Sequence, residues 1–165
     1  MSSDISGTQK HLKYMQQAFF LAEQAYDEKE VPVGAVVIKD DRIIGKGYNQ
    51  TERLKDPTAH AEMLAISAAC STLEQKYLQD CTLYVTLEPC PMCAGALVWS
   101  KIDTVVIGAW DANAGSCGSV FNISSDKKLN HQVNVVQGFM EQDSEWILKQ
   151  FFQERRSEEN GRLSD

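Results

Sequence analysis

The tightest constraint on the fold comes from one run of residues, in which an apolar segment leads into a pair of cysteines. The segment "TLYVTL" (residues 82–87) is rich in the β-branched and aromatic side chains typical of a buried strand. Directly after it, "EPCPMCAGAL" places Cys90 and Cys93 three residues apart, with Pro91 suited to the first turn of a helix. Residues three apart on a helical turn lie on the same side. The chain is therefore expected to form a strand-to-helix junction that presents two thiols together.

The same alternation of strand and helix patterns continues through the rest of the chain. Apolar residues recur at intervals of three and four from Leu12 to Tyr26, which predicts a first helix. Two strand patterns, "VGAVVIK" and "RIIGKGY", flank Asp40 and Asp41 and predict a β-hairpin. Further elements are expected as a helix over 56–73 capped by Thr58, a helix over 91–101, strands over 103–109 and 131–137, and a helix over 143–156. This pattern predicts an α/β domain in which helices cover a sheet.

Length and composition fit a single globular domain. The chain has 165 residues, of which 43% are hydrophobic and 24% charged. We expect one domain over residues 9–157, with loose tails at 1–8 and 158–165. No apolar run approaches the roughly 20 residues of a membrane span. The polar N-terminus lacks the apolar core of a signal peptide, and an odd count of five cysteines argues against a disulfide framework. A cytoplasmic protein without a membrane partner is expected, and the net charge of -7 disfavours a generic nucleic-acid coat.

A histidine elsewhere in the chain can join the two thiols. His60 stands in the short motif "HAE" at the start of a predicted helix, and Cys90 follows it by 30 residues at another such start. Loop-to-helix junctions of α/β sheets gather at one edge, where ligands bind. One histidine and two cysteines form a normal set of zinc ligands, so His60, Cys90 and Cys93 are predicted to hold one Zn²⁺ per chain.

Whether this zinc site is structural or catalytic depends on a fourth protein ligand. Cys70 lies about 15 Å along the helix from His60, and Cys81 lies roughly 20 Å along the strand from the site. Neither can reach the metal, whereas Cys117 and His131 stay open as candidates. Three ligands with a position left for water favour a catalytic site. A structural zinc module with Cys117 or His131 as fourth ligand is the alternative that is not an enzyme.

Glu62 has the position expected of a proton carrier. It is two residues from His60, and residues so spaced on a helix do not face the same way. We therefore expect Glu62 beside the metal rather than on it. A carboxylate there can take a proton from a zinc-activated water and deliver it elsewhere.

The two motifs together resemble a known signature. "HAE" followed by "PCPMC" is similar to the H-x-E…P-C-x-x-C pattern of the zinc-dependent nucleoside and nucleobase deaminases. That resemblance implies a three-layer α/β/α, cytidine-deaminase-like fold around a central mixed sheet. It also implies hydrolytic deamination by zinc-bound hydroxide, with Glu62 as the catalytic proton shuttle. A guanine or cytosine deaminase of the same superfamily is an alternative that the zinc motif alone leaves open.

A longer resemblance extends from about residue 10 to residue 157. "VPVGAVVI", "DPTAHAE", "TLYVTLEPCPMCAGAL", "GAWDANAGSCGS", "LNHQV" and "FFQERR" look like the bacterial tRNA-specific adenosine deaminases. Members of that family convert the wobble adenosine of a tRNA anticodon to inosine. The resemblance implies a homodimer that binds the anticodon stem-loop and flips the target base into the zinc pocket. One departure is Trp110, where relatives often carry a basic or small residue.

Matching motif positions imply a set of substrate contacts. Asn49 corresponds to a residue that contacts the nucleoside, and Val33 with the backbone at Ala61 lines the purine slot. Asp111 lies near the sugar, where a 2′-hydroxyl can be read. Of the two phenylalanines in "FFQERR", we expect one in the core and one exposed, and the glycines of "GKGYN" and "GSCGS" are expected in turns or bulges. The remaining contacts implied on the RNA side are Asn130, His131, Phe152, Arg155 and Arg156.

Overall fold

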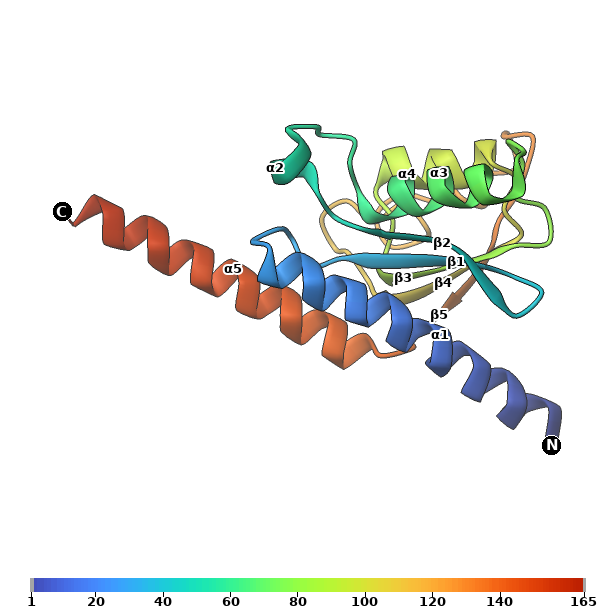
Figure 1. The fold of residues 1–165 in the computed structure, drawn as a ribbon, viewed down its shortest axis with the longest axis horizontal. Coiled ribbons are helices and arrows are strands. Elements are labelled where there is room, and N and C mark those ends of the chain that lie inside the picture. Colours follow the sequence, from blue (N-terminus) through green and yellow to red (C-terminus); the bar gives the residue numbers. More distant parts are fainter. Residues whose placement is uncertain (1, 165) are drawn as a thin grey trace.

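A five-stranded mixed sheet forms the middle layer of the protein. The computed structural model describes residues 2–164 and shows the strand order β2-β1-β3-β4-β5 (Figure 1). The first two strands pair antiparallel, β1 pairs antiparallel with β3, and the remaining pairs are parallel. This confirms the expected mixed sheet. The strands are β1 (Gly34–Lys39), β2 (Arg42–Tyr48), β3 (Thr82–Leu87), β4 (Thr104–Ala109) and β5 (Asn134–Gln137).

Helices cover both faces of this sheet, which makes the predicted three layers. Two helices lie on one face and two on the other, and a short helix connects the hairpin to the second layer (Figure 1). The face with the longer helices carries α1 (Ser2–Asp27) and α5 (Glu141–Leu163); the other carries α3 (Ala61–Leu73) and α4 (Pro91–Trp99), and the connecting helix is α2 (Thr51–Leu54).

The turn of the β1–β2 hairpin follows from its two aspartates. Asp40 and Asp41 have φ angles of 49° and 59°, both in the left-handed region that a two-residue type I′ turn requires. Aspartate tolerates that region better than most residues. The resulting register places Gly34 opposite Tyr48 and Ala35 opposite Val85. The start of β1 and the ends of β2, β3 and β4 therefore meet at one edge of the sheet.

Close helix packing depends on two glycines within β2. A Cβ added at Gly45 would lie 2.4 Å from the carbonyl oxygen of Ala65, and one at Gly47 would lie 2.3 Å from that of Ala61. These glycines were expected in a turn or bulge. For Gly45 the expectation agrees with the register shift of the hairpin, because Val37 pairs with Gly45 whereas Ile38 pairs with Ile43. Gly47 is regularly paired with Ala35, so for Gly47 the expectation was wrong. Both glycines let α3 approach the sheet backbone.

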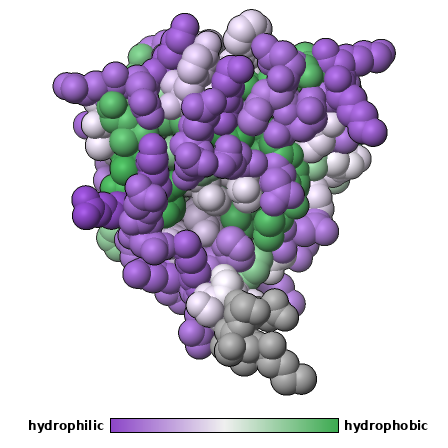
Figure 2. Space-filling model, turned by 90° about the vertical axis from the view of Figure 1, so that its right-hand side faces the viewer, coloured by the Kyte–Doolittle hydropathy of each residue, from purple (hydrophilic) through white to green (hydrophobic). Residues whose placement is uncertain are grey.

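The two cores lie on opposite faces of the sheet. One is built from the inward residues of β1, β3 and β4 with α3 and α4, and includes Leu83, Val85 and Leu97. The other lies under α1, where Met15 and Ala18 pack with Val36, Tyr84 and Val106 of the sheet. The end of the molecule near the N-terminus shows mostly hydrophilic residues with hydrophobic bands between them (Figure 2). No helix of the described residues is both long and apolar enough to cross a bilayer.

Helix boundaries differ from the expectation in three places. α3 begins at Ala61 with His60 as its N-cap, whereas Thr58 lies in a turn in which its N–H and hydroxyl both donate to Asp56. The helices α1 and α5 also include residues 2–8 and 158–163, expected as loose tails. The side chains of residues 152–164 are all exposed, so helix propensity and backbone hydrogen bonds hold this end rather than burial. The domain limits at 9 and 157 stay a prediction.

Candidate active site

The predicted metal ligands meet where the strands end. His60 and Cys90 are the N-cap residues of α3 and α4, and Cys93 lies in the first turn of α4. Both helices therefore direct their N-termini toward this site, and unpaired N–H groups there favour negative charge. The strand-to-helix junction predicted from "TLEPCPMC" is confirmed.

The three side chains form a compact group. Nδ1 of His60 lies 3.6 Å from Sγ of Cys90 and 3.5 Å from Sγ of Cys93. Tetrahedral zinc with ordinary Zn–N and Zn–S bond lengths separates a nitrogen and a sulfur ligand by about 3.6 Å. Among the described residues, these three are the group of His, Cys, Asp and Glu side chains close enough to share an ion. The donor set and its spacing fit zinc.

The electrostatics of the two thiols also suit a cation. The Cys93 thiol, and then His60, hydrogen-bond to Cys90 and lower its pKa to about 4. The same hydrogen bond between the thiols, with burial, raises the pKa of Cys93. The site therefore carries one thiolate readily and a second only when positive charge arrives. A divalent ion supplies that charge, and thiolates are the form that binds metal.

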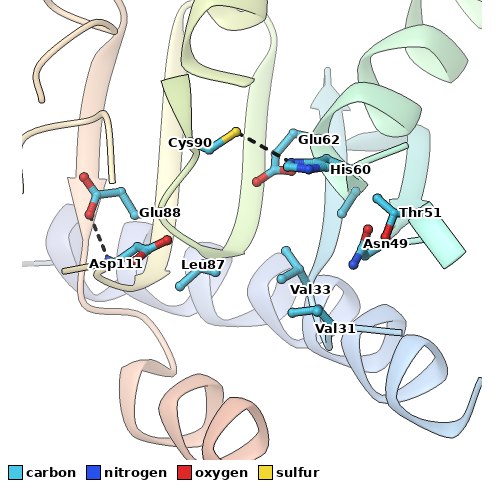
Figure 3. A pocket seen from close by; sticks show the side chains of 11 residues that line it. Val31, Val33, Asn49, Thr51, His60, Glu62, Leu87, Glu88, Cys90 and Asp111 are labelled. Carbon is cyan, nitrogen blue, oxygen red and sulfur yellow. Dashed lines mark hydrogen bonds between the residues drawn. The ribbon is translucent and has the colours of Figure 1, made fainter. Parts of the chain in front are cut away.

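Glu62 lies beside the triad and outside it. Its side chain is only 4% exposed, and Cys93 Sγ donates to its Oε2 at 3.4 Å. Burial raises the pKa of this carboxyl. Glu62 also faces the pocket, where it points toward the same space as His60 (Figure 3). A buried carboxyl with a raised pKa accepts a proton more readily than a free one, which suits a group that takes up a proton and passes it on.

A pocket of about 230 Å³ opens in front of this group. Its size lies just below the usual range for drug-sized ligands and suits a single small ring system. The opposite walls are well separated, with Asn49 and Thr51 on one side and Glu88 and Asp111 on the other (Figure 3). The full lining is Val31, Val33, Asn49, Thr51, His60, Ala61, Glu62, Leu87, Glu88, Cys90 and Asp111.

Asn49 carries an unpaired acceptor in this lining. Asn49 is 8% exposed, and its Oδ1 has no hydrogen-bond partner among the described residues. A buried amide oxygen without a partner costs free energy, so a ligand that donates a hydrogen bond there would be favoured. Together with Val33, Ala61 and Asp111, Asn49 was predicted from the sequence, and the structure brings all four to the pocket.

Several residues of the pocket escaped the sequence analysis. Val31, Thr51, Leu87 and Glu88 line it, and each of them lies within or close to a motif or residue that the sequence analysis recognised. Glu30 stabilises the wall of the pocket that carries Thr51. It is 1% exposed, and its carboxylate accepts the N–H groups of Glu52 and Arg53 at 3.2 and 2.7 Å, which fixes the start of α2.

The connection between β4 and β5 takes two of the predicted residues away from the pocket. His131 Nε2 contacts the carbonyl oxygen of Ile102 at 2.7 Å, just before β4 begins. Asp111 follows the opposite end of that strand. Asn130 and His131 thus precede β5 at the far edge of the sheet, and their contact with RNA stays a prediction.

The predicted residues of α5 also lie outside the pocket. Phe151 is 6% exposed and Phe152 is 45% exposed, as expected for a pair that divides between core and surface. The Arg155 guanidinium lies 5.6 Å from the centre of the Phe151 ring. Tyr26, near the end of α1, donates to Glu154, which joins the two helices at the pocket's end of the molecule. Phe152, Arg155 and Arg156 therefore lie on a neighbouring surface, beyond the pocket lining.

Among the described residues, no fourth protein ligand lies near His60, Cys90 and Cys93. Cys117 is buried and its thiol has a pKa raised by burial to about 12, so it stays protonated. Neither Cys117 nor His131 belongs to the triad in the part of the chain that the structure covers. Cys70 and Cys81 contact the carbonyls of Lys76 and Gln79 instead. The open side of the triad faces the pocket.

Comparison with known families assigns the class of protein. The family model of the cytidine and deoxycytidylate deaminase zinc-binding region matches residues 8–109 of the chain. The chain belongs to that deaminase family, and its fold and site agree with this assignment. It is a zinc-dependent deaminase that hydrolyses a C–N bond.

Individual relatives narrow the similarity. The chain is 49% identical over 144 residues to the tRNA-specific adenosine deaminase of Aquifex aeolicus, covering 87% of this chain and 95% of the relative. It is 44% identical over 143 residues to that of Bacillus subtilis, with 87% and 89% covered. A solved structure from a study of A-to-I editing by tRNA deaminases at the wobble position is 39% identical, with a TM-score of 0.79 over 82% of this chain and 98% of that one.

Proposed function

We propose that this protein deaminates adenosine to inosine at the wobble position of a tRNA anticodon. The observation that carries the proposal is the pocket in which a zinc-binding triad, a buried glutamate and an unpaired asparagine oxygen face one space. The similarity to tRNA-specific adenosine deaminases extends over most of the chain and supports the choice of substrate. His60, Cys90 and Cys93 would hold one Zn²⁺.

The proton chemistry falls to Glu62. Zinc, when bound, lowers the pKa of a coordinated water to about 7 and so makes a nucleophile available at neutral pH. The Glu62 carboxylate takes a proton from the water that attacks C6 and delivers it to N1. Glu62 then passes the remaining proton of that water to the amino group on C6. The amino group leaves as ammonia, and inosine remains. Water and adenosine are consumed in equal amounts, and no redox partner is needed.

The walls of the pocket would orient the base and its sugar. Val31, Val33 and Leu87 supply apolar surface for the ring, and Asn49 Oδ1 offers an acceptor. Asp111 lies on the opposite wall from Asn49 (Figure 3). We assign Asp111 to the sugar of the target nucleoside. A base must leave its stack to enter such a pocket, and an anticodon loop presents bases that are already partly unstacked.

Contacts with the rest of the RNA would come from α5. Phe152 exposes an aromatic ring, and Arg155 and Arg156 are exposed at the same end of the molecule. Aromatic stacking and arginine on phosphate are favourable with single-stranded RNA. Binding energy from these contacts would hold C6 in place for attack.

The protein is proposed to act as a homodimer in the cytoplasm, where its tRNA substrate occurs. Trp99 at the end of α4 is 77% exposed, and Val120 and Phe121 are 45% and 51% exposed. Exposed large apolar side chains of this kind support an interface between protein chains.

One assay tests the activity directly. Purified zinc-loaded protein is incubated with an anticodon stem-loop that has adenosine at the wobble position, and inosine is measured by nucleoside analysis. We expect inosine from the stem-loop and little product from free adenine, guanine or cytosine. Rapid deamination of free guanine without product from the stem-loop would instead support a guanine deaminase. A guanine deaminase from Bacillus subtilis is 39% identical with a TM-score of 0.59, covering 65% of this chain and 69% of that one.

A further inference from the structure

Glu88 is a buried carboxylate that the chemistry described above does not use. It is 1% exposed and lies between the end of β3 and Cys90. No cation pairs with it among the described residues. The N–H groups of Asp111, Cys117 and Ser119 donate to it at 3.0, 3.0 and 3.2 Å, and the Ser119 hydroxyl donates at 2.5 Å. Charge-assisted hydrogen bonds of this kind are roughly twice as strong as neutral ones.

The segment that donates these bonds is folded around the carboxylate. A Cβ added at Gly115 would lie 2.1 Å from Oε1 of Glu88, so only glycine fits at this position. Ser116 N donates to the carbonyl oxygen of Pro89 at 2.8 Å, next to the metal ligand Cys90. The Ser119 hydroxyl also contacts the carbonyl oxygen of Asp111 at 2.8 Å. Residues 111–119, here named the Asp111 loop, are therefore attached to the metal-binding turn mainly through Glu88.

This attachment fixes a residue of the substrate pocket. The Asp111 N–H is held by Glu88, and the Asp111 carboxylate accepts the N–H groups of Asn113 and Ala114 at 2.9 and 3.3 Å. Both Glu88 and Asp111 line the pocket, and the dashed contact between them is visible in the close view (Figure 3). The Glu88 carboxylate thus supplies the side-chain link between Asp111 and the metal-binding turn, in addition to the backbone bonds from Glu88 N to Ala109 O and from Ser116 N to Pro89 O.

We propose that Glu88 is a positioning residue that binds the Asp111 loop to the metal-binding turn and thereby sets the geometry with which Asp111 meets the substrate. A carboxylate is required because four donors converge on it. Glutamine has the same shape but replaces one acceptor oxygen with a donor NH₂ group, which would face N–H groups of the loop. The inference rests on the proposed function for its substrate, and its structural part is independent of it.

A kinetic test uses the variant Glu88→Gln in a double-mutant cycle with Asp111→Asn. We expect Glu88→Gln to keep one zinc per chain and to raise the KM for the anticodon stem-loop at least tenfold, with a smaller change in kcat. Because Glu88 acts through Asp111, the effect of Asp111→Asn should largely disappear in the Glu88→Gln background. Additive effects of the two substitutions on kcat/KM, or an unchanged KM, would overturn the proposal.

A second test needs no substrate. Trp110 precedes Asp111, and its ring lies about 4 Å from the position of a Cβ on Gly118, within the same loop. With Trp99→Phe and Trp146→Phe as background, Trp110 becomes the sole tryptophan and its fluorescence reports on the loop. We expect Glu88→Gln to increase acrylamide quenching and lower the anisotropy of Trp110. Identical quenching in the two proteins would contradict the inference even if no RNA activity were found, and a loop change without RNA activity would contradict only the proposed function.

Milder and matched variants complete the design. Ser119→Ala removes one donor to Glu88 and should raise KM a few-fold in the same direction, which tests the inference if Glu88→Gln does not fold. Ser125→Ala is the control for it, because Ser125 donates to Val133 O and has no contact with Glu88. Asp103→Asn controls for the exchange of a carboxylate for an amide, since Asp103 accepts the Asp80 N–H at the far edge of the sheet. Effects of the controls equal to those of Glu88→Gln and Ser119→Ala would refute a specific role.

Discussion

At the scale of single residues, two of the three predicted zinc ligands, His60 and Cys90, are the N-cap residues of helices. His60 and Cys90 have extended backbone angles and precede α3 and α4, so their side chains point past the helix ends rather than along the helices. Their N-cap positions also place the unpaired N–H groups of each first turn close to the thiolates. Glu62, inside α3, points beside the metal position instead of onto it. Glu62 follows the ligand His60 by two residues, little more than half a helical turn, and this places the proton carrier beside the ligands.

The separation predicts distinct outcomes for substitutions at the site. Glu62→Gln should keep one zinc per chain and lower kcat by about 10² to 10⁴, because an amide of the same shape cannot shuttle a proton. His60→Ala, Cys90→Ala and Cys93→Ala should lose both zinc and activity. Metal content by atomic emission and single-turnover kinetics measure the two properties. Cys70→Ala is the matched control for a cysteine away from the metal, and loss of its zinc would contradict the ligand assignment.

At the scale of elements, α5 has two parts with different surroundings. Its first turns bury Ser144, Ile147 and Phe151 under the sheet and α1. Its later residues are exposed, and Arg155 and Arg156 lie in this exposed part. The helix therefore extends past the pocket's edge of the sheet (Figure 1). Charge at that position can be changed without disturbing the core.

We expect Arg155→Ala combined with Arg156→Ala to weaken binding of the stem-loop while zinc content and unfolding temperature stay close to those of the parent. Each lost phosphate contact should reduce the slope of log K against log salt by about 1. Fluorescence anisotropy titrations at several salt concentrations measure this slope. A control with the same loss of charge is Lys13→Ala with Lys76→Ala, on α1 and beyond α3. An unchanged slope in the arginine variant would show that α5 does not contact RNA.

The contact between α1 and β3 makes stability depend on pH. His11 Nδ1 lies 2.8 Å from the hydroxyl of Tyr84, and burial lowers the pKa of His11. Burial raises the pKa of Tyr84 to about 12, so its hydroxyl remains protonated and can donate to a neutral His11. The unfolded chain binds a proton at His11 more readily than the folded protein does. Stability from this group is therefore full above pH of about 6.5 and is lost as pH falls through the lower folded-state pKa.

Urea unfolding between pH 5 and 8 tests the effect. His11→Asn should flatten part of the loss of unfolding free energy on the acid side, because asparagine does not titrate. The comparison is made as a difference between the two proteins at each pH, which removes the contribution of the zinc ligands. Parallel stability curves for the parent and the variant would refute a contribution from His11.

The sequence allowed prediction of those features whose causes are local. The hairpin and the five strands follow from alternation and turn residues within short segments. The metal triad follows from two short motifs, each placed at the start of a predicted helix, although His60 and Cys90 are 30 residues apart. Glu88 and Glu30 were missed because their partners lie 22–31 residues away and are brought together only by the tertiary fold. The sequence did not show that the irregular connection between β4 and β5 carries Asn130 and His131 to the far edge of the sheet, and their contact with RNA stays a prediction. Motif matching does not specify the path of such a connection.

At the scale of the whole molecule, the metal site lies at the rim of a fold that has two cores of its own. The clusters on the two faces of the sheet contain residues such as Leu83, Leu97 and Met15 and extend well beyond the metal site. A chain of this size buries enough apolar surface to fold without a metal. The site differs in this respect from small zinc modules that unfold when the ion is removed.

Removal of zinc should therefore lower stability without unfolding the protein. At free zinc near 1,000 times Kd, binding contributes about 4 kcal/mol, which corresponds to an unfolding temperature lower by on the order of 10 °C for a chain of this length. Circular dichroism after dialysis against a chelator should retain the helix and strand signal at 25 °C. The His60→Ala variant should show the lower temperature with or without chelator. Complete loss of secondary structure on chelation would contradict the view of two metal-independent cores.

Because α5 extends past the sheet, its exposed C-terminal part is expected to open locally more often than its buried part. Residues beyond Arg156 have no buried side chains, so only the backbone ladder protects their amide hydrogens. An isolated helical segment of this length is marginally stable in water. Hydrogen exchange along this one helix should therefore change from slow near Phe151 to fast near Leu163. The position of this change along α5 would report where bound RNA contacts the helix. Nucleotides resting on the exposed turns would move the boundary between slow and fast amides toward the C-terminus.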